Sequence, residues 1–239
     1  MMRVSIERIA VLFAGARRTG RAFAIPSDAT LGSADDAYRV QDAVFEQLWP
    51  GQVPQAWKAG SGSDGIEPTG APIAEVHPSP ARLAAQRMNM IGIEAEIAFR
   101  IGTGGSLAEA LVAIEVCDTR FADWKSASPL WKLADFQSNG SLVVGSGTRT
   151  WRDIDFQTQL VELRIGARTI TARGSHPWRD PSRLLPWALA HCARRGRPLR
   201  TGDLVTTGSW TGMEFAKPGD EIVARFPGVG EAAVRFDAR

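Results

Sequence analysis

The sequence predicts an α+β protein in which a small helical region precedes a larger β-rich domain. Three observations support this prediction: apolar residues recur at helical spacing near the N-terminus, an alternation of period two begins after residue 88, and one long helical segment interrupts the strands at 180–196. Hydrophobic residues make up 44% and charged residues 23% of the chain, a balance typical of globular proteins. We place the helical region at 1–60 and the β-rich domain at 61–239.

Two helices are predicted at the start of the chain. Ile6, Ile9 and Phe13 give the first helix one apolar face. The second begins after Ser33, whose hydroxyl can accept a hydrogen bond from a free N–H of the first turn. It ends at residues 50–51, a Pro-Gly pair that cannot continue a helix.

Residues 50–80 are rich in Gly, Pro and Ser. Such residues interrupt both helices and strands, so we expect one long loop. A loop of this length within a compact domain is usually functional or disordered.

The β-rich domain begins with a strand over 91–101, in which apolar residues alternate with charged or small ones. This alternation predicts a half-buried strand with one face against the core. Further strands are expected at residues 111–120, 142–144, on both sides of Gly166-Ala167, and at 203–207, 221–226 and 232–236.

One long helix is predicted between these strands. Asp180 is its expected N-cap, Pro181 its first residue, and Gly196 lies just past its end. Pro186 should kink the helix near its first turn, because proline lacks the N–H that the helix needs there.

Charge and composition exclude several classes of protein. The chain has 28 basic and 26 acidic residues, so we expect no nucleic-acid partner and no anionic membrane surface as partner. No apolar stretch approaches the length of a membrane span, and the first twenty residues lack the pattern of a signal peptide. The two cysteines form neither a disulfide framework nor a zinc motif. We expect a cytoplasmic protein.

The first chemical signal is a pair of acids in the strand over 91–101. Glu94 and Glu96 are two residues apart, so both project from the same face. Like charges at neighbouring positions repel one another and favour a cation between them. The alternative is that both are solvated residues of an edge strand, where charged side chains are common.

A third acid on an adjacent strand would complete an oxygen-rich site for Mg²⁺ or Mn²⁺. The strand over 111–120 offers Glu115 and Asp118. In an unbroken strand these two point to opposite faces, so only one of them can join the site.

Several segments, taken in order, raise the metal hypothesis above the edge-strand alternative. The order is YRVQ, AWKAG, GIEAEIAFRIG, AIEVCDTRFADWK, LADFQSNGSLVVG and RRGRPLRTGDLVTTGSWTGMEFAKPGD. Together they resemble the fumarylacetoacetate hydrolase superfamily, and most of all its 2-keto-4-pentenoate hydratase and 4-oxalocrotonate decarboxylase branch. The resemblance runs from residue 38 to the C-terminus.

The resemblance implies a mixed β-roll core of the fumarylacetoacetate hydrolase C-terminal type, which makes 61–239 the catalytic domain. It also implies a Mg²⁺ or Mn²⁺ ion held by Glu94, Glu96 and Glu115, with Asp118 as the fallback third ligand. Lys58 of AWKAG matches the lysine that lies over the substrate in that branch.

Other positions are implied less directly. Asp135 and Ser138 of DFQS match a catalytic loop near the pocket. Ser209 and Thr211 of TTGSWTG match the loop that closes on the substrate. Arg120 is a candidate anchor for a substrate carboxylate, and a structural salt bridge is the alternative role for it.

The implied activity is that of a metal-dependent lyase, a hydratase or a decarboxylase, acting on a 2-oxo or 2-hydroxydienoate acid in the breakdown of aromatic compounds. A chelated 2-oxo acid gains a stabilised enolate from the metal, and Lys58 would pair with its carboxylate or steer protons. The sequence departs from the branch at Thr69, where hydratases often carry an acid.

Two other functions stay open at this point. Within the superfamily, the alternative is an acylpyruvate-type C–C bond hydrolase or an oxaloacetate-type decarboxylase. Outside catalysis, it is a partner subunit that binds a small acid. The resemblance also implies a homo-oligomer, at least a dimer.

Overall fold

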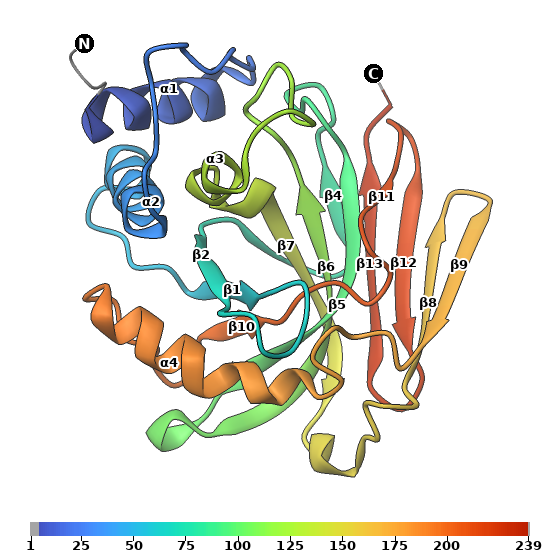
Figure 1. Ribbon diagram of the computed structural model, residues 1–239. Coiled ribbons are helices and arrows are strands. Elements are labelled where there is room, and N and C mark those ends of the chain that lie inside the picture. Colours follow the sequence, from blue (N-terminus) through green and yellow to red (C-terminus); the bar gives the residue numbers. More distant parts are fainter. Residues whose placement is uncertain (1–4, 239) are drawn as a thin grey trace.

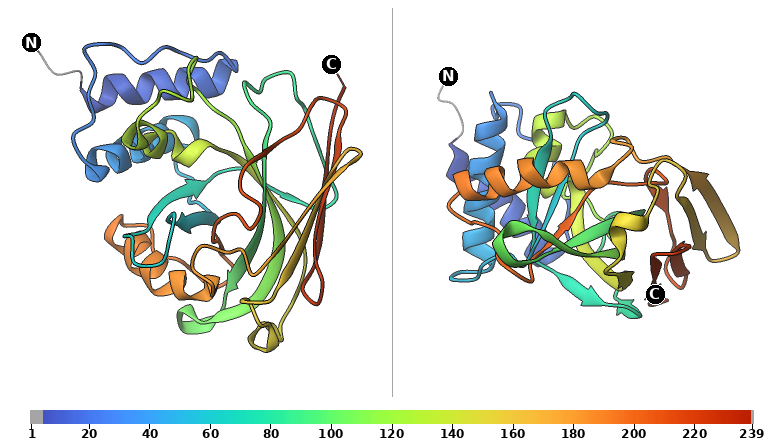
Figure 2. Two further views of the ribbon diagram at one scale, coloured as in Figure 1. Left: turned by 45° about the vertical axis from the view of Figure 1, so that its right-hand side comes forward. Right: turned by 90° about the horizontal axis from the view of Figure 1, so that it is seen from below.

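The computed structural model describes residues 5–238. Helices lie on one side of a large curved sheet and a smaller sheet stands on its other side (Figures 1 and 2). The predicted α+β class is confirmed. The first four residues of the region 1–60 and the last residue of the domain 61–239 lie outside the described part, and the division at residue 60 stays a prediction.

The two predicted N-terminal helices are present as α1 (Ile6–Thr19) and α2 (Ala34–Leu48). The hydroxyl of Ser33 accepts a hydrogen bond from the N–H of Asp36 at 3.1 Å and so caps α2. Gly20 ends α1 in the left-handed region, at φ 67°. The buried faces of α1 and α2 pack together, with Phe13 and Phe45 in their shared core.

The large sheet has eight strands within the described residues, in the order β2-β1-β10-β5-β6-β7-β3, with β11 also paired to β5. The bounds of these strands are β1 Ala56–Gly60, β2 Thr69–Ile73, β3 Val76–Pro78, β5 Gly92–Ile101, β6 Leu107–Cys117, β7 Asn139–Thr148, β10 Leu204–Thr206 and β11 Glu214–Phe215. Parallel pairs, β1 with β10 and β3 with β7, occur beside antiparallel ones, so the sheet is mixed.

The smaller sheet has five strands in the order β4-β13-β12-β8-β9. Their bounds are β4 Ala81–Leu83, β8 Leu160–Ile165, β9 Arg168–Arg173, β12 Glu221–Phe226 and β13 Gly230–Phe236. The main core lies between the two sheets. The alternate apolar residues of β5, among them Ile93, Ile97 and Phe99, all pack into it, as the alternation of the sequence predicts.

The segment from residue 50 to 80 is not one loop. It contains β1, β2 and β3, and the part between strands that remains irregular is short. Gly and Pro obscured the strand signal, but β1 is paired on both sides, with β2 and β10, so tertiary hydrogen bonds outweigh the local preference.

The long helix is also divided. Pro181–Leu184 form a 3-10 turn, which Asp180 caps through the N–H of Ser182 at 2.9 Å. The α-helix α4 (Leu185–Arg194) follows, with Pro186 in its first turn. Proline therefore stands where no intrahelical N–H is needed, and the expected irregularity becomes a change of helix type. A short helix, α3 (Pro129–Ala134), precedes β7.

Within residues 5–238, none of the helices combines the length and the apolar character needed to cross a membrane.

His191 on α4 is 4% exposed and stacks on Trp187 with a ring separation of 4.4 Å. Burial, and next to it the charge of Arg195, lower the pKa of His191 to about 4. We therefore predict that the folded chain loses stability relative to the unfolded chain as pH falls from about 6.5 to about 4, because only the unfolded histidine takes up a proton there.

Urea denaturation at pH 7 and pH 4.5 measures this effect. The wild type should lose roughly 1–2 kcal/mol more between the two pH values than His191→Phe, which keeps the aromatic stack. An equal loss of unfolding free energy in the two proteins would contradict the lowered pKa of His191.

Candidate functional site

The pairing of β5 with β6 places two carboxylates face to face. Glu94 lies directly opposite Glu115 in the antiparallel register, and Glu96 is the next residue on the same face of β5. Glu96 and Glu115 are fully buried, and Glu94 is partly buried. All three acids are on the face of the large sheet that points away from the main core. We call Glu94, Glu96 and Glu115 the carboxylate cluster.

Glu96 is held by the last residue of β10 and by the backbone just after that strand. The hydroxyl of Thr206 and the N–H of Gly208, the latter at 3.0 Å, both donate to Oε2 of Glu96. The other oxygen, Oε1, is buried and has no hydrogen-bond partner within the described residues. An unpaired buried acceptor costs about 1–3 kcal/mol, so this oxygen is a natural donor atom for a ligand.

Lys58 reaches the carboxylate cluster from β1. Its Nζ donates to Oε1 of Glu115 at 2.6 Å and to the main-chain carbonyl of Gln137 at 3.3 Å. Asn139, the first residue of β7, donates from Nδ2 to the same Oε1 at 2.9 Å. The second oxygen of Glu115, Oε2, is buried without a partner within residues 5–238, as Oε1 of Glu96 is.

The charges of the cluster perturb one another. Burial, and then the charge of Glu115, raise the pKa of Glu94, and the same causes together with Glu94 raise the pKa of Glu96 to about 8. Burial lowers the pKa of Lys58, but the charges of Glu115 and its neighbours outweigh burial, and the pKa stands above its ordinary value. The raised pKa values show that the ionised forms of Glu94 and Glu96 are unfavourable beside Glu115 when one ammonium is present, so a further cation would stabilise them.

Cys117 lies at the edge of the same face. One ligand atom each from Glu94, Glu115 and Cys117 lie within 4.8 Å of one another, and the thiol donates to Oε2 of Glu94 at 3.6 Å. Burial, followed by the charges of Glu94 and Glu115, raises the pKa of Cys117, so it is a neutral thiol. A neutral thiol is a poor ligand, and the site offers carboxylate oxygens instead.

These donors fit a divalent metal ion. Two buried carboxylate oxygens without partners, on Glu96 and Glu115, lie on one face with the carboxylate of Glu94. Hard divalent cations prefer such oxygen donors over sulfur. The carboxylate cluster would hold the ion, and Lys58 stands beside it.

The loop before β7 has an unusual backbone. Phe136, Gln137 and Ser138 all have positive φ, at 56°, 53° and 61°. Three consecutive non-glycine residues in this region are strained, and such strain is often found at functional sites. The loop presents the carbonyl of Gln137 to Lys58, and the Nε2 of Gln137 donates to Oγ1 of Thr69 at 2.7 Å.

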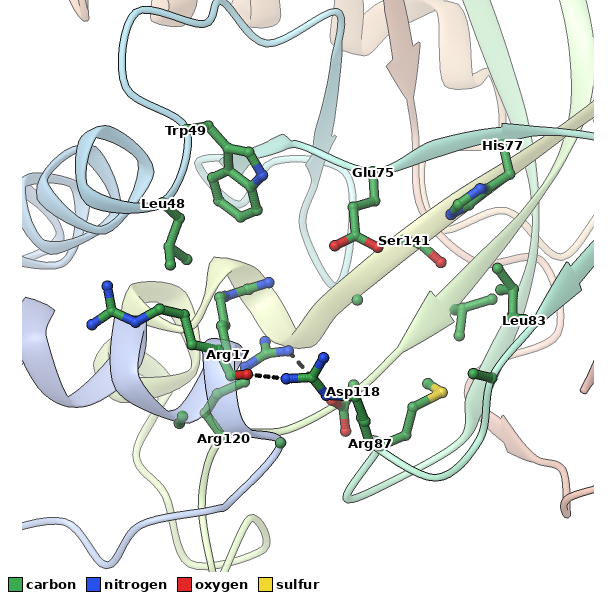
Figure 3. A pocket seen from close by; sticks show the side chains of 17 residues that line it. Arg17, Leu48, Trp49, Glu75, His77, Leu83, Arg87, Asp118, Arg120 and Ser141 are labelled. Carbon is green, nitrogen blue, oxygen red and sulfur yellow. Dashed lines mark hydrogen bonds and ion pairs between the residues drawn. The ribbon is translucent and has the colours of Figure 1, made fainter. Parts of the chain in front are cut away.

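The predicted residues Asp118, Arg120 and Asp135 are not brought to the carboxylate cluster. Arg120 donates from its main chain and its guanidinium to the buried carboxylate of Asp135. Asp118 accepts the N–H groups of Asn89 and Met90 at 2.9 and 3.0 Å and lies 3.9 Å from Arg120 (Figure 3). Asp118 lies three residues after Glu115. This odd spacing turns its side chain to the other side of the sheet, because successive side chains of an extended chain point to opposite faces.

The other predicted residues lie around the cluster without touching it. Ser138 accepts a hydrogen bond from the indole of Trp124 at 3.2 Å. The hydroxyls of Ser209 and Thr211 donate hydrogen bonds to the main-chain carbonyl of Gly212, at 2.9 and 3.1 Å, within the loop that begins at Gly208.

Sequence reasoning missed three residues that hold the cluster in place: Gln137, Asn139 and Thr206. Asn139 lies three residues before the strand expected at 142–144, so its place near a strand end could be read from the sequence, although only the pairing with Cys117 brings it to the end of β6. Thr206 and the carbonyl of Gln137 carry none, since only the order of strands in the sheet brings them to Glu96 and Lys58.

Comparisons with known proteins show the family and the fold of the chain. The model of the family described as "Fumarylacetoacetate (FAA) hydrolase C-terminal" matches residues 66–237. A 2-keto-4-pentenoate hydratase of Paraburkholderia xenovorans is 30% identical over 159 residues, which are 61% of this chain and 59% of that protein. A 4-oxalocrotonate decarboxylase of Pseudomonas putida is 27% identical over 165 residues, 60% of this chain and 59% of that one. The chain thus spans about three fifths of these relatives.

Solved structures show the same fold. The 4-oxalocrotonate decarboxylase of Pseudomonas putida G7, complexed with magnesium and adipate, superposes with a TM-score of 0.82 at 20% identity, over 98% of this chain and all of that chain. A fumarylpyruvate hydrolase of Pseudomonas aeruginosa, in complex with Mn²⁺ and pyruvate, gives a TM-score of 0.54 at 16% identity, over 78% and 91%. The predicted mixed sheet core and the resemblance are both confirmed, and the chain belongs to the fumarylacetoacetate hydrolase family.

Proposed function

We propose that this chain is a divalent-metal-dependent lyase, a hydratase or a decarboxylase, that acts on a 2-oxo or 2-hydroxydienoate acid such as 2-keto-4-pentenoate in the breakdown of aromatic compounds. The observation that carries the proposal is the carboxylate cluster with two unpartnered buried oxygens and Lys58 against it. Relatives named hydratase and decarboxylase support the reaction class. Relatives of known structure that hold magnesium or Mn²⁺ support Mg²⁺ or Mn²⁺ as the ion.

A bound divalent ion would act as a Lewis acid on the carboxylate and keto oxygens of the substrate and lower the energy of an enolate. Glu94, Glu96 and Glu115 would hold this ion. Lys58, as an ammonium at the edge of the cluster, would pair with the substrate carboxylate and hold a proton close to the reacting carbons.

The substitution at residue 69 bears on the choice between hydration and decarboxylation. Thr69 has no carboxyl group, and its hydroxyl accepts from Gln137. The nearest acid in the chain, Glu67, is exposed and accepts from the indole of Trp187 at 2.7 Å. Water addition needs a general base, whereas loss of CO₂ from a chelated 2-oxo acid does not. This observation favours decarboxylation among the two lyase reactions.

We also propose a cytoplasmic homo-oligomer, at least a dimer, as the resemblance to the family implies. Light scattering of the purified protein tests the assembly, and a monomer would contradict it.

The reaction class is tested by a panel of substrates with Mg²⁺ and with Mn²⁺. We expect turnover of 4-oxalocrotonate, or of 2-hydroxypenta-2,4-dienoate, and loss of that turnover on addition of EDTA. Turnover of neither dienoate, with hydrolysis of an acylpyruvate instead, would replace the lyase proposal by a C–C hydrolase.

Metal binding can be measured apart from turnover. Calorimetric titration of Mn²⁺ should give one site per chain in the wild type and an affinity about 10–100-fold lower in Glu96→Gln, because the neutral amide is a weaker donor. Glu109→Gln is the matched control, since Glu109 lies on β6 and pairs with Arg100 at 3.1 Å. Equal binding by wild type and Glu96→Gln would exclude Glu96 as a ligand.

Lys58 can be tested in the same way. Lys58→Met should lower kcat about 10²–10⁴-fold, as expected when a positioned proton-transfer or charge-pairing group is removed. Lys125→Met, at an exposed lysine, is the control and should leave kcat unchanged. Circular dichroism checks that Lys58→Met is folded, and an unchanged kcat in a folded variant would remove Lys58 from the site.

A further inference from the structure

A cavity lies on the other side of β6 from the carboxylate cluster. Its volume is about 390 Å³, and it is lined by the ends of α1 and α2 and by residues of β3, β6 and β7. Val116 and Asp118 line it, whereas Glu115 and Cys117, which alternate with them, point to the other face. The sheet therefore separates this cavity, which we call the rear cavity, from the candidate metal site.

Two residues that line the rear cavity each carry a buried nitrogen without a hydrogen-bond partner within residues 5–238. These nitrogens are Nε of Arg17 and Nε2 of His77. Figure 3 shows His77, Glu75 and Ser141 on one side of the cavity and Arg17, Arg87 and Arg120 on the other. Buried polar nitrogens without partners are costly. A carboxylate oxygen can accept from the Nε–H of Arg17, and from His77 in the tautomer that carries its proton on Nε2.

The charge of the rear cavity favours an anion. Four arginines line it, against the two acids Glu75 and Asp118. Arg120 is already occupied by Asp135 and Asp118. Arg17 comes no closer to Asp135 than 3.9 Å, which is beyond hydrogen-bond distance. Burial, and then the charge of Arg120, lower the pKa of Arg17 to about 9. The positive charge of Arg17 is therefore incompletely compensated, and a carboxylate beside it would stabilise it.

Part of the lining of the rear cavity is apolar. Leu48, the last residue of α2, and Trp49 lie on one side, and Leu83, the last residue of β4, lies on the opposite side (Figure 3). Met88 also lines the cavity. A small inorganic anion would leave these apolar side chains in contact with water. A ligand with one carboxylate and an apolar body would use both the arginines and the apolar side chains.

We propose that the rear cavity binds a small organic carboxylate with an apolar body, of the aryl carboxylate class, through Arg17 and His77. This site is separate from the carboxylate cluster and needs no metal ion. Binding here depends on the residues of the rear cavity and not on the proposed lyase activity.

Benzoate, in buffer with EDTA, is the probe. Calorimetry should show one benzoate per chain in the wild type and in Glu96→Gln. Affinity should fall about tenfold or more in His77→Leu and in Arg17→Met, since each removes a hydrogen bond to a charged group. The neutral isostere benzamide and inorganic phosphate should both bind much more weakly than benzoate.

His77→Leu is the decisive variant, because Nε2 of His77 has no partner within the described chain to lose, whereas Arg17 also donates to the carbonyl of Asn139 at 3.0 Å. Four results would overturn the proposal: no binding of benzoate by the wild type at millimolar concentration, equal binding by His77→Leu, loss of binding in folded Glu96→Gln, or phosphate binding as tight as that of benzoate. Loss of metal binding in Glu96→Gln would not affect it, so the two proposals fail separately.

Discussion

The ion pair between Lys58 and Glu115 is the contact on which the candidate site depends. The register of β5 with β6 sets Glu115 opposite Glu94, which brings like charges together in a buried place. Without the ammonium 2.6 Å from Glu115, this arrangement would be strongly unfavourable, because removing one partner of a buried pair leaves an uncompensated charge. Lys58 neutralises part of the negative charge of the cluster. The negative charge that remains makes the cluster suited to a divalent cation.

The two faces of the large sheet carry side chains of different chemistry. On β6, Glu115 and Cys117 lie on the face that holds the carboxylate cluster, while Val116 and Asp118, the residue after the strand, line the rear cavity. Asn139 connects the two, since its amide donates to Glu115 and its carbonyl accepts from Arg17. A change in the position of Arg17 would therefore reach a metal-site carboxylate through one residue, a short and physically continuous path.

Much of the fold follows from local patterns in the sequence. The alternation in β5 predicted which side chains enter the core, and Ser33 predicted where α2 begins, because both depend on residues that are neighbours in the chain. The strands between residues 50 and 80 did not show the same pattern. Their Gly and Pro residues favour loops, and β1 exists because β2 and β10 supply hydrogen bonds on its two sides.

The sequence by itself determined that Glu94 and Glu96 share a face and that Glu115 and Asp118 cannot, because a strand turns successive side chains to opposite sides. Only the tertiary structure decided which of these acids lies opposite Glu94, and that Arg120 is paired with Asp135 instead of with the carboxylate cluster. It also decided that Lys58 meets Glu115, 57 positions away, since the parallel pairing of β1 with β10 is a long-range contact that no local period encodes. The faces of each strand are local properties, whereas the neighbours of each face depend on the order in which strands pack.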